Sequence, residues 1–349
     1  MTTQAKTLAP ARPAAARPLI AVYGAAGHTA RFVIAELRRR GLAVRALARD
    51  VSKLDAALIA NDEAIEVGIA DAAALDRALA GCSVLIHCAG PFLDTARPLA
   101  DAALRAGCHY IDVTAEQAAA AMILDEFDAP ARAAGIAMLP AAGFYGGLAD
   151  LLASALLADA DAGPAHTLDT AITLSDWWPT AGTRITGERN RVPRVVRQDG
   201  RLVPLAQPAP ASDWDFAAPF GRQAMVDLPF SEIMTLAHHL PVPNLRSRLN
   251  SASLEQIRNP ATPAPAAADA DGRSAQHFMM EVVATGAQGE RRARAEGRDI
   301  YALSAQMVVE AAQRLVQGAP RAGAFALGQL FEPRGFLAAL APDHLTFEA

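Results

Sequence analysis

Residues 19–30, Leu-Ile-Ala-Val-Tyr-Gly-Ala-Ala-Gly-His-Thr-Ala, decide the fold of this chain. A short apolar run ends at Gly24, Gly27 and then Ala30 follow, and a helix-like segment continues to residue 40. Gly24 permits a sharp turn, and Gly27 lets the backbone approach a pyrophosphate closely. The amides at the start of the helix attract the same anion. The stretch therefore predicts the first strand, turn and helix of a dinucleotide-binding βαβ unit; a small-residue turn in another α/β protein is the alternative.

The end of the second predicted strand indicates which dinucleotide is bound. NAD sites usually carry an acidic residue there, which holds the ribose hydroxyls. This chain has Arg49, whose guanidinium suits a 2′-phosphate, and Lys53 follows nearby. NADP is therefore the expected cofactor, unless Arg49 and Asp50 form only a solvated loop pair. The expected cofactor-binding residues are Gly24, Ala25, Ala26, Gly27, His28, Thr29, Arg49, Lys53, Cys88, Ala89, Gly90, Pro91 and Phe92.

Composition limits the possible partners. The chain has 349 residues and a net charge of −5, so we expect neither a nucleic acid nor an anionic membrane as partner. No apolar run reaches the ~18–20 residues that a membrane-spanning helix needs. Its three cysteines form no C-x-x-C pair, so neither a metal site nor a disulfide framework is expected. These features favour a cytoplasmic protein with reduced thiols.

The first 145 residues alternate short apolar strands with helical segments, which predicts a Rossmann-type, doubly wound parallel sheet. We expect strands over 19–23, 43–48, 64–69, 83–89, 109–113 and 136–141, and helices over 29–40, 52–60, 72–80, 95–106, 115–134 and 146–160. Helix ends are indicated by Gly41, Gly81, Gly107 and Gly135, each just before a strand.

The pattern changes after residue 150. Strand-like runs over 167–175, 192–197, 222–228 and 276–286 are separated by Pro- and Gly-rich connections, which favours a mixed or antiparallel sheet. Residues 259–273 read as a loop and residues 301–317 as an amphipathic helix. We therefore expect a disordered tail over 1–17, a dinucleotide-binding domain over 18–150, an α+β substrate domain over 151–300 and a helical segment over 301–349 that returns to the first domain.

Four blocks in the first domain carry a resemblance to a known family. They are residues 22–30 (Val-Tyr-Gly-Ala-Ala-Gly-His-Thr-Ala), 88–92 (Cys-Ala-Gly-Pro-Phe), 106–116 (Ala-Gly-Cys-His-Tyr-Ile-Asp-Val-Thr-Ala-Glu) and 140–150 (Pro-Ala-Ala-Gly-Phe-Tyr-Gly-Gly-Leu-Ala-Asp). Because these four blocks occur in this order, the chain resembles the saccharopine dehydrogenase-like NADP-binding oxidoreductases. This family includes saccharopine reductases and trans-acting enoyl reductases. The resemblance implies a second domain for substrate binding and homodimerisation. Tyr145 stands where many relatives have Asp, and Ala115 replaces a glycine, so the substrate does not follow from the resemblance.

Three residues are candidates for catalysis. The Tyr-x-x-x-Lys pair of short-chain dehydrogenases is absent, because no tyrosine has a lysine four positions later. Tyr145, in a glycine-rich loop after a strand, is the first candidate for a proton donor. Asp112 and Glu116, near the end of the fifth strand, are candidates for positioning Tyr145 or a substrate amine. The alternatives are packing for Tyr145, a loop anchor for Asp112 and a helix N-terminal turn for Glu116.

Two features of the second domain have a functional and a structural interpretation. Arginines crowd one segment and either bind a substrate carboxylate or form a solvated strand face: Arg184, Arg189, Arg191, Arg194 and Arg197. Trp177 and Trp178 either line a pocket or fill the core between the domains.

We expect an NADPH-dependent oxidoreductase that reduces a C=N, C=O or activated C=C bond of a small metabolite by hydride transfer. The alternative is a redox sensor that binds NADP without turnover, since no complete acid–base pair is visible. A structural protein with an inactive nucleotide site is disfavoured by the intact Gly24, Gly27 and Arg49.

Overall fold

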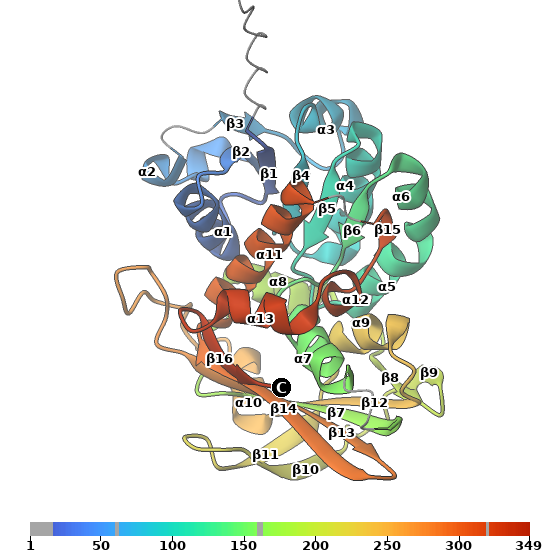
Figure 1. The fold of residues 1–349 in the computed structure, drawn as a ribbon. Coiled ribbons are helices and arrows are strands. Elements are labelled where there is room, and N and C mark those ends of the chain that lie inside the picture. The colour runs from blue at the N-terminus through green and yellow to red at the C-terminus, as the bar shows by residue number, and fades with distance from the viewer. Residues whose placement is uncertain (1–16, 60–62, 159–162, 319–320) are drawn as a thin grey trace, which may run out of the picture.

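The chain folds around two β-sheets that lie at opposite ends of the molecule (Figure 1). The structure, a computed structural model, describes residues 17–59, 63–158, 163–318 and 321–349. The tail expected over residues 1–17 therefore lies almost entirely outside the described residues. No helix of the described ranges combines the length and apolar character that crossing a membrane requires.

The first sheet is parallel throughout and has the strand order β15-β6-β5-β4-β1-β2-β3. The order reverses between β1 and β4, which is where ligands bind in doubly wound sheets. Strand bounds are β1 Leu19–Tyr23, β2 Ala43–Ala48, β3 Glu63–Glu66, β4 Val84–His87, β5 His109–Asp112, β6 Ala137–Leu139 and β15 Gly323–Ala324. The central strands β1 and β4 are almost wholly buried, as a sheet covered on both faces requires.

Helices cover this sheet on both faces and connect its strands. Their bounds are α1 His28–Arg39, η1 Val51–Lys53, α2 Ala56–Ile59, α3 Ala72–Leu79, α4 Phe92–Ala106, α5 Gln117–Glu126, α6 Asp128–Ala134 and, after the second domain, α11 Ile300–Gln317. Helix α11 packs beside α1 and contacts β4 and β5. The C-terminal part of the chain thus returns to the first sheet, as Figure 1 also shows.

The second sheet is mixed and has nine strands, ordered β10-β11-β12-β7-β13-β14-β16, with β8 and β9 branching from β12. Only β7 and β12 run parallel; the other pairs are antiparallel. The bounds are β7 Ala165–Leu174, β8 Val195–Gln198, β9 Arg201–Pro204, β10 Ala211–Asp215, β11 Arg222–Asp227, β12 Asn244–Asn250, β13 His277–Gly286, β14 Gly289–Arg298 and β16 Leu345–Glu348.

Helix α7 (Gly147–Leu157) links the two sheets and is buried over nearly its whole length. It packs on β13 and β14 and contacts three further helices, α9, α12 and α13. The remaining helices are α8 Ala181–Arg189, α9 Glu232–His239, α10 Ser251–Arg258, α12 Leu327–Leu330 and α13 Pro333–Leu340. Helix α8 has no buried residue, although it lies between the domains.

The predicted fold class is confirmed: a Rossmann-type parallel sheet is followed by a mixed sheet. All four glycines expected to end helices have positive φ, between 65° and 76°. Two details differ from the prediction. The helix expected over 115–134 is split at Phe127, because Pro130 has no N–H to continue the hydrogen-bond ladder. The segment 301–349, expected to be helical, also contributes β15 to the first sheet and β16 to the second.

Asp299 begins α11, the helix that joins the two parts of the fold. Its backbone has a positive φ of 56°, and its side chain is fully buried. Oδ1 accepts hydrogen bonds from the amides of Tyr301 and Ala302, at 3.0 and 3.1 Å, and Oδ2 accepts one from Ser274 at 2.7 Å. One carboxylate therefore caps the helix and fixes the segment that precedes β13.

We predict that Asp299→Ala lowers the free energy of unfolding by about 2–4 kcal/mol, because a helix cap is lost and a buried amide is left without an acceptor. Asp299→Asn retains an acceptor oxygen, so we expect it to lose less. Urea denaturation of the three proteins measures this. Equal stability of Asp299→Ala and the unmodified chain would contradict the role of the cap.

Candidate functional site

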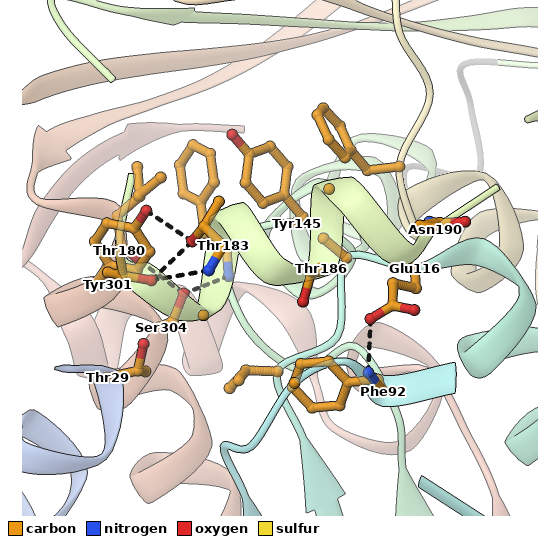
Figure 2. Close-up of a pocket in the computed structure, with 18 of the residues that line it drawn as sticks. Thr29, Phe92, Glu116, Tyr145, Thr180, Thr183, Thr186, Asn190, Tyr301 and Ser304 are labelled. Carbon is orange, nitrogen blue, oxygen red and sulfur yellow. Dashed lines mark hydrogen bonds between the residues drawn. The ribbon is translucent and has the colours of Figure 1, made fainter. Parts of the chain in front are cut away.

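A cavity of about 220 Å³ lies between the two domains at the carboxyl ends of β1, β4 and β5. Thr29, Phe92 and Glu116 line it from the first domain, and α8 lies across it with Thr183 and Thr186 (Figure 2). Ligands of doubly wound sheets bind at this edge. Four of the expected cofactor residues therefore meet Tyr145 at this cavity: Thr29, Cys88, Gly90 and Phe92.

The glycine turn has the geometry that close approach of a phosphate requires. Gly24 has a φ of 84°, and a Cβ there would lie 2.8 Å from the Cβ of Ala89, so only glycine fits. Gly27 is exposed and is the N-cap of α1, and no side chain caps this helix. The first amides of α1 are thus left for a ligand rather than for the protein's own side chains.

A buried histidine fixes the segment that follows β4. His87 Nε2 lies 2.9 Å from Thr95 Oγ1, and its Nδ1 accepts a hydrogen bond from the amide of Ala89 at 3.2 Å. Burial lowers the pKa of His87 to about 3, which keeps the ring neutral and able to accept. The Thr95 hydroxyl also lies within hydrogen-bond distance of the Ala89 and Pro91 carbonyls.

Cys88, Gly90 and Phe92, all expected to contact the cofactor, line the cavity. A Cβ on Gly90 would lie 2.7 Å from Thr186 Oγ1, so α8 of the second domain closes directly over this segment. Burial raises the pKa of the Cys88 thiol to about 12, so it stays protonated. Cys88 therefore serves as a wall of the cavity and not as a nucleophile.

The two cationic residues proposed for the 2′-phosphate differ in their surroundings. Arg49 is exposed at the end of β2 and forms no hydrogen bond or ion pair with the described residues. Lys53 lies in η1, and its Nζ is 3.3 Å from Asp50 Oδ2. Arg49 is the more available partner for an anionic ligand, and Asp50 partly neutralises Lys53.

Tyr145 is held in a tight loop between β6 and α7. Gly146 has a φ of 98°, and a Cβ there would lie 2.6 Å from the carbonyl of Ala141. From the second domain, Ser231 Oγ is within hydrogen-bond distance of the carbonyls of Tyr145 and Thr114, at 3.1 and 2.9 Å. Both domains therefore fix the position of Tyr145.

The Tyr145 side chain lines the cavity among aromatic rings. Ring centroids of Phe230 and Trp177 lie 4.3 and 5.7 Å from that of Tyr145. Its hydroxyl is buried and has no hydrogen-bond partner among the described residues. Burial, and then the nearby Tyr301 and Glu232, raise the pKa of Tyr145 well above its usual value, so the phenol stays protonated.

Asp112 is fully buried and is not among the residues that line the cavity. Its carboxylate accepts hydrogen bonds from the Tyr110 hydroxyl at 2.8 Å and from the amides of Thr114 and Ala141 at 2.9 and 2.8 Å. Burial raises its pKa to about 6 despite these bonds. Asp112 thus ties the end of β5 to the loop that carries Tyr145.

Glu116 does line the cavity, but its two carboxylate oxygens accept hydrogen bonds from the amides of Phe92 and Leu93, at 2.7 and 3.2 Å. These amides belong to the first turn of α4, where a negative charge is favourable. Burial raises the pKa of Glu116. The side chain thus has a structural partner and also faces the cavity.

The cavity is lined by several hydroxyl groups to which the sequence reasoning gave no role in the site. Thr180, Thr183 and Thr186 recur every third residue along α8, and Thr180 caps the helix through the amide of Thr183 at 3.1 Å. The Tyr301 hydroxyl lies 3.1 Å from Thr183 Oγ1 and accepts a hydrogen bond from Trp177 Nε1 at 3.3 Å. The spacing of the threonines was visible in the sequence, whereas the position of Tyr301 depends on the return of α11.

Comparisons with known proteins agree with this architecture. Residues 24–130 match the family model described as NAD(P)H-binding. No curated protein matches the sequence.

Among solved structures, apo saccharopine dehydrogenase (L-Glu forming) from Saccharomyces cerevisiae is similar with a TM-score of 0.65 and 14% identity, over 95% of this chain and 99% of that one. GenD2 from gentamicin A biosynthesis, solved in complex with NAD, gives a TM-score of 0.46 and 14% identity, over 98% and 100% of the two chains. The resemblance expected from the sequence is confirmed at the level of the fold: the chain has the fold of saccharopine dehydrogenase, and its residues 24–130 match the NAD(P)H-binding family.

Proposed function

We propose that the protein is an NADPH-dependent oxidoreductase that reduces a C=N, C=O or activated C=C bond of a small molecule. The observation that carries this proposal is the position of the cavity. It lies at the carboxyl ends of β1, β4 and β5, next to the glycine turn, and the second domain closes it. A substrate held there would lie beside a dinucleotide bound at the turn.

The residues of the first domain fit such a cofactor. The segment from Gly24 to Thr29 would hold the pyrophosphate, because α1 begins there without a side-chain cap. Arg49 would pair with a 2′-phosphate. Gly90, in the segment fixed by His87 and Thr95, would allow close approach of the nicotinamide half. When bound, a reduced nicotinamide supplies the hydride.

Tyr145 would supply the proton. Its hydroxyl is buried without a partner among the described residues, and its raised pKa keeps it protonated at neutral pH. The proton would pass to the substrate atom that receives the electron pair of the reduced bond. Asp112 would act as a positioning residue, because it holds the loop of Tyr145 to β5. Glu116 would hold the first turn of α4 at the mouth of the cavity.

The second domain's sheet as a homodimer interface, and a cytoplasmic location, stay predictions from the sequence.

The first prediction concerns the pyrophosphate. Gly27→Asp should weaken NADPH binding by roughly tenfold or more, equivalent to about 1.4 kcal/mol. The aspartate still caps α1 but adds a negative charge where the phosphates would lie. Gly27→Asn is the matched control, because it has the same shape without the charge. Calorimetric titration of NADPH measures both, and equal affinities for the Asp and Asn variants would contradict the proposed phosphate position.

The second prediction concerns the choice of cofactor. Arg49→Ala should weaken NADPH binding about tenfold, the effect of one solvent-exposed charge-assisted contact, and leave NADH binding unchanged. Arg77→Ala removes the same charge from an exposed position of α3 and serves as control. A parallel loss for NADH, or tighter binding of NADH than NADPH by the unmodified protein, would argue against NADP.

The third prediction concerns proton transfer. Tyr145→Phe should lower kcat about 100-fold on a substrate found by screening imines, oxo acids and enoyl compounds, because it removes the proton donor and keeps the ring. NADPH affinity should stay the same. Tyr301→Phe removes a hydroxyl that already has partners, so its kcat should fall less. A larger loss in Tyr301→Phe would move the donor role to that residue.

A further inference from the structure

One cationic side chain, Arg194, lines the cavity without an ion-pair partner among the described residues. It precedes β8 and is half-buried. Its Nη1 donates a hydrogen bond to the carbonyl of Pro229 at 2.5 Å. The guanidinium centre lies 4.9 Å from the ring centroid of Phe230, which in turn stacks near Tyr145. The charge is thus fixed beside the proposed proton donor.

The neighbouring arginines of the same segment have other roles. Arg184 donates to the carbonyls of Asn259 and Thr262, and Arg197 donates to that of Leu240 at 3.0 Å. Arg189 pairs with Asp94 at 2.8 Å. None of these three lines the cavity. The arginine-rich segment therefore contributes one arginine, Arg194, to the cavity. The sequence had allowed the interpretation that several of these arginines bind a substrate carboxylate together.

Glu232 is the acidic group whose charge acts on Arg194, but the two side chains form no ion pair among the described residues. Glu232 is fully buried, and its Oε1 accepts a hydrogen bond from the amide of Phe230 at 2.8 Å. Burial raises the pKa of Glu232, and the charge of Arg194 acts against this shift. Burial lowers the pKa of Arg194, and the nearby Glu232 opposes this effect. Glu116, at the mouth of the cavity, is held by the first turn of α4.

The walls around Arg194 are mainly apolar. The rings of Tyr145, Trp177 and Phe230 form one side, and Val113, Ile257 and Ile300 line other parts. A second or third anionic group on a ligand would be placed against these rings without a counter-charge, which is costly. A planar apolar body would instead pack on them.

We propose that Arg194 is the anion receptor of this cavity and that the substrate is a compact molecule with an apolar body and a single anionic group. This inference rests on the proposed function in taking the cavity as the substrate site. It assigns the arginine segment of the second domain a role in specificity.

Benzoate tests the proposal, because it has one carboxylate on a planar apolar ring and needs no turnover. Its binding is followed by quenching of tryptophan fluorescence, since Trp177 lines the cavity. The neutral benzamide has the same shape, and benzene-1,3,5-tricarboxylate has the same ring with three charges. We expect saturable binding of benzoate at millimolar concentration and weaker binding of the other two.

Arg194→Gln should weaken benzoate binding by roughly tenfold or more and leave benzamide binding unchanged, since charge-assisted hydrogen bonds are lost. Arg194→Lys should give an intermediate loss, because it keeps the charge without the planar fork. Arg191→Gln removes the same charge from an exposed neighbour and should bind benzoate normally. Circular dichroism checks the fold of each variant.

Three results would overturn the proposal: no saturable binding of benzoate, equal binding of benzoate and benzamide, or equal losses in Arg194→Gln and Arg191→Gln. Tighter binding of the tricarboxylate would overturn the assignment of a single anionic group. NADPH titration of the same proteins separates the two proposals. If benzoate binds selectively but NADPH does not bind, the proposed cofactor is refuted and the anion receptor is retained. If NADPH binds but benzoate does not bind selectively, the anion receptor is refuted and the cofactor is retained.

Discussion

The carboxylate of Asp112 is the constraint on which the site depends. It is buried at the end of β5 and accepts hydrogen bonds from two loops, one leading to Glu116 and one leading to Tyr145. The amide of Ala142 adds a hydrogen bond to the Asp112 carbonyl at 2.8 Å. Because the loops share one anchor, a shift of either would leave a buried polar group unpaired, which costs about 1–3 kcal/mol. The second domain then binds the same loops through Ser231, so both domains define the shape of the cavity.

The strands of the first domain could be predicted closely, because short stretches of sequence indicate where each strand and helix begins and ends. Apolar runs and glycines at helix ends gave β1 and β2 with their observed bounds and placed the other strands within a few residues. In the second domain, the runs expected over 167–175, 192–197, 222–228 and 276–286 overlap β7, β8, β11 and β13, whereas β12 and β14 were not expected. Strand β14 (Gly289–Arg298) is rich in charged residues and has no apolar alternation, yet it pairs along its whole length with β13. Strand β12 is parallel to β7, which lies far away in the sequence.

The candidate site also has a part that could be predicted from the sequence and a part that could not. The sequence placed the glycine turn and the segment 88–92 at the carboxyl ends of β1 and β4, and Thr29, Cys88, Gly90 and Phe92 of these segments line the cavity. The role of Arg49 stays a proposal. The sequence did not show which arginine of the second domain faces the cavity. Five arginines occupy one short segment, and only the fold distinguishes them. The partners of Tyr301 and Ser304 depend on α11, which returns to the cavity after the whole second domain.

Helix α8 forms a wall of the cavity, yet none of its nine residues is buried. Its connections to the first domain are an exposed ion pair between Arg189 and Asp94, worth about 0–1 kcal/mol, and hydrogen bonds such as that between Thr183 and Tyr301. An element with so little buried apolar surface opens at a small fraction of the free energy that global unfolding requires. Amide hydrogen exchange in α8 should therefore proceed by local opening, at a lower free energy than in the buried strands β1 and β4. This wall of the cavity can then open while both sheets stay intact.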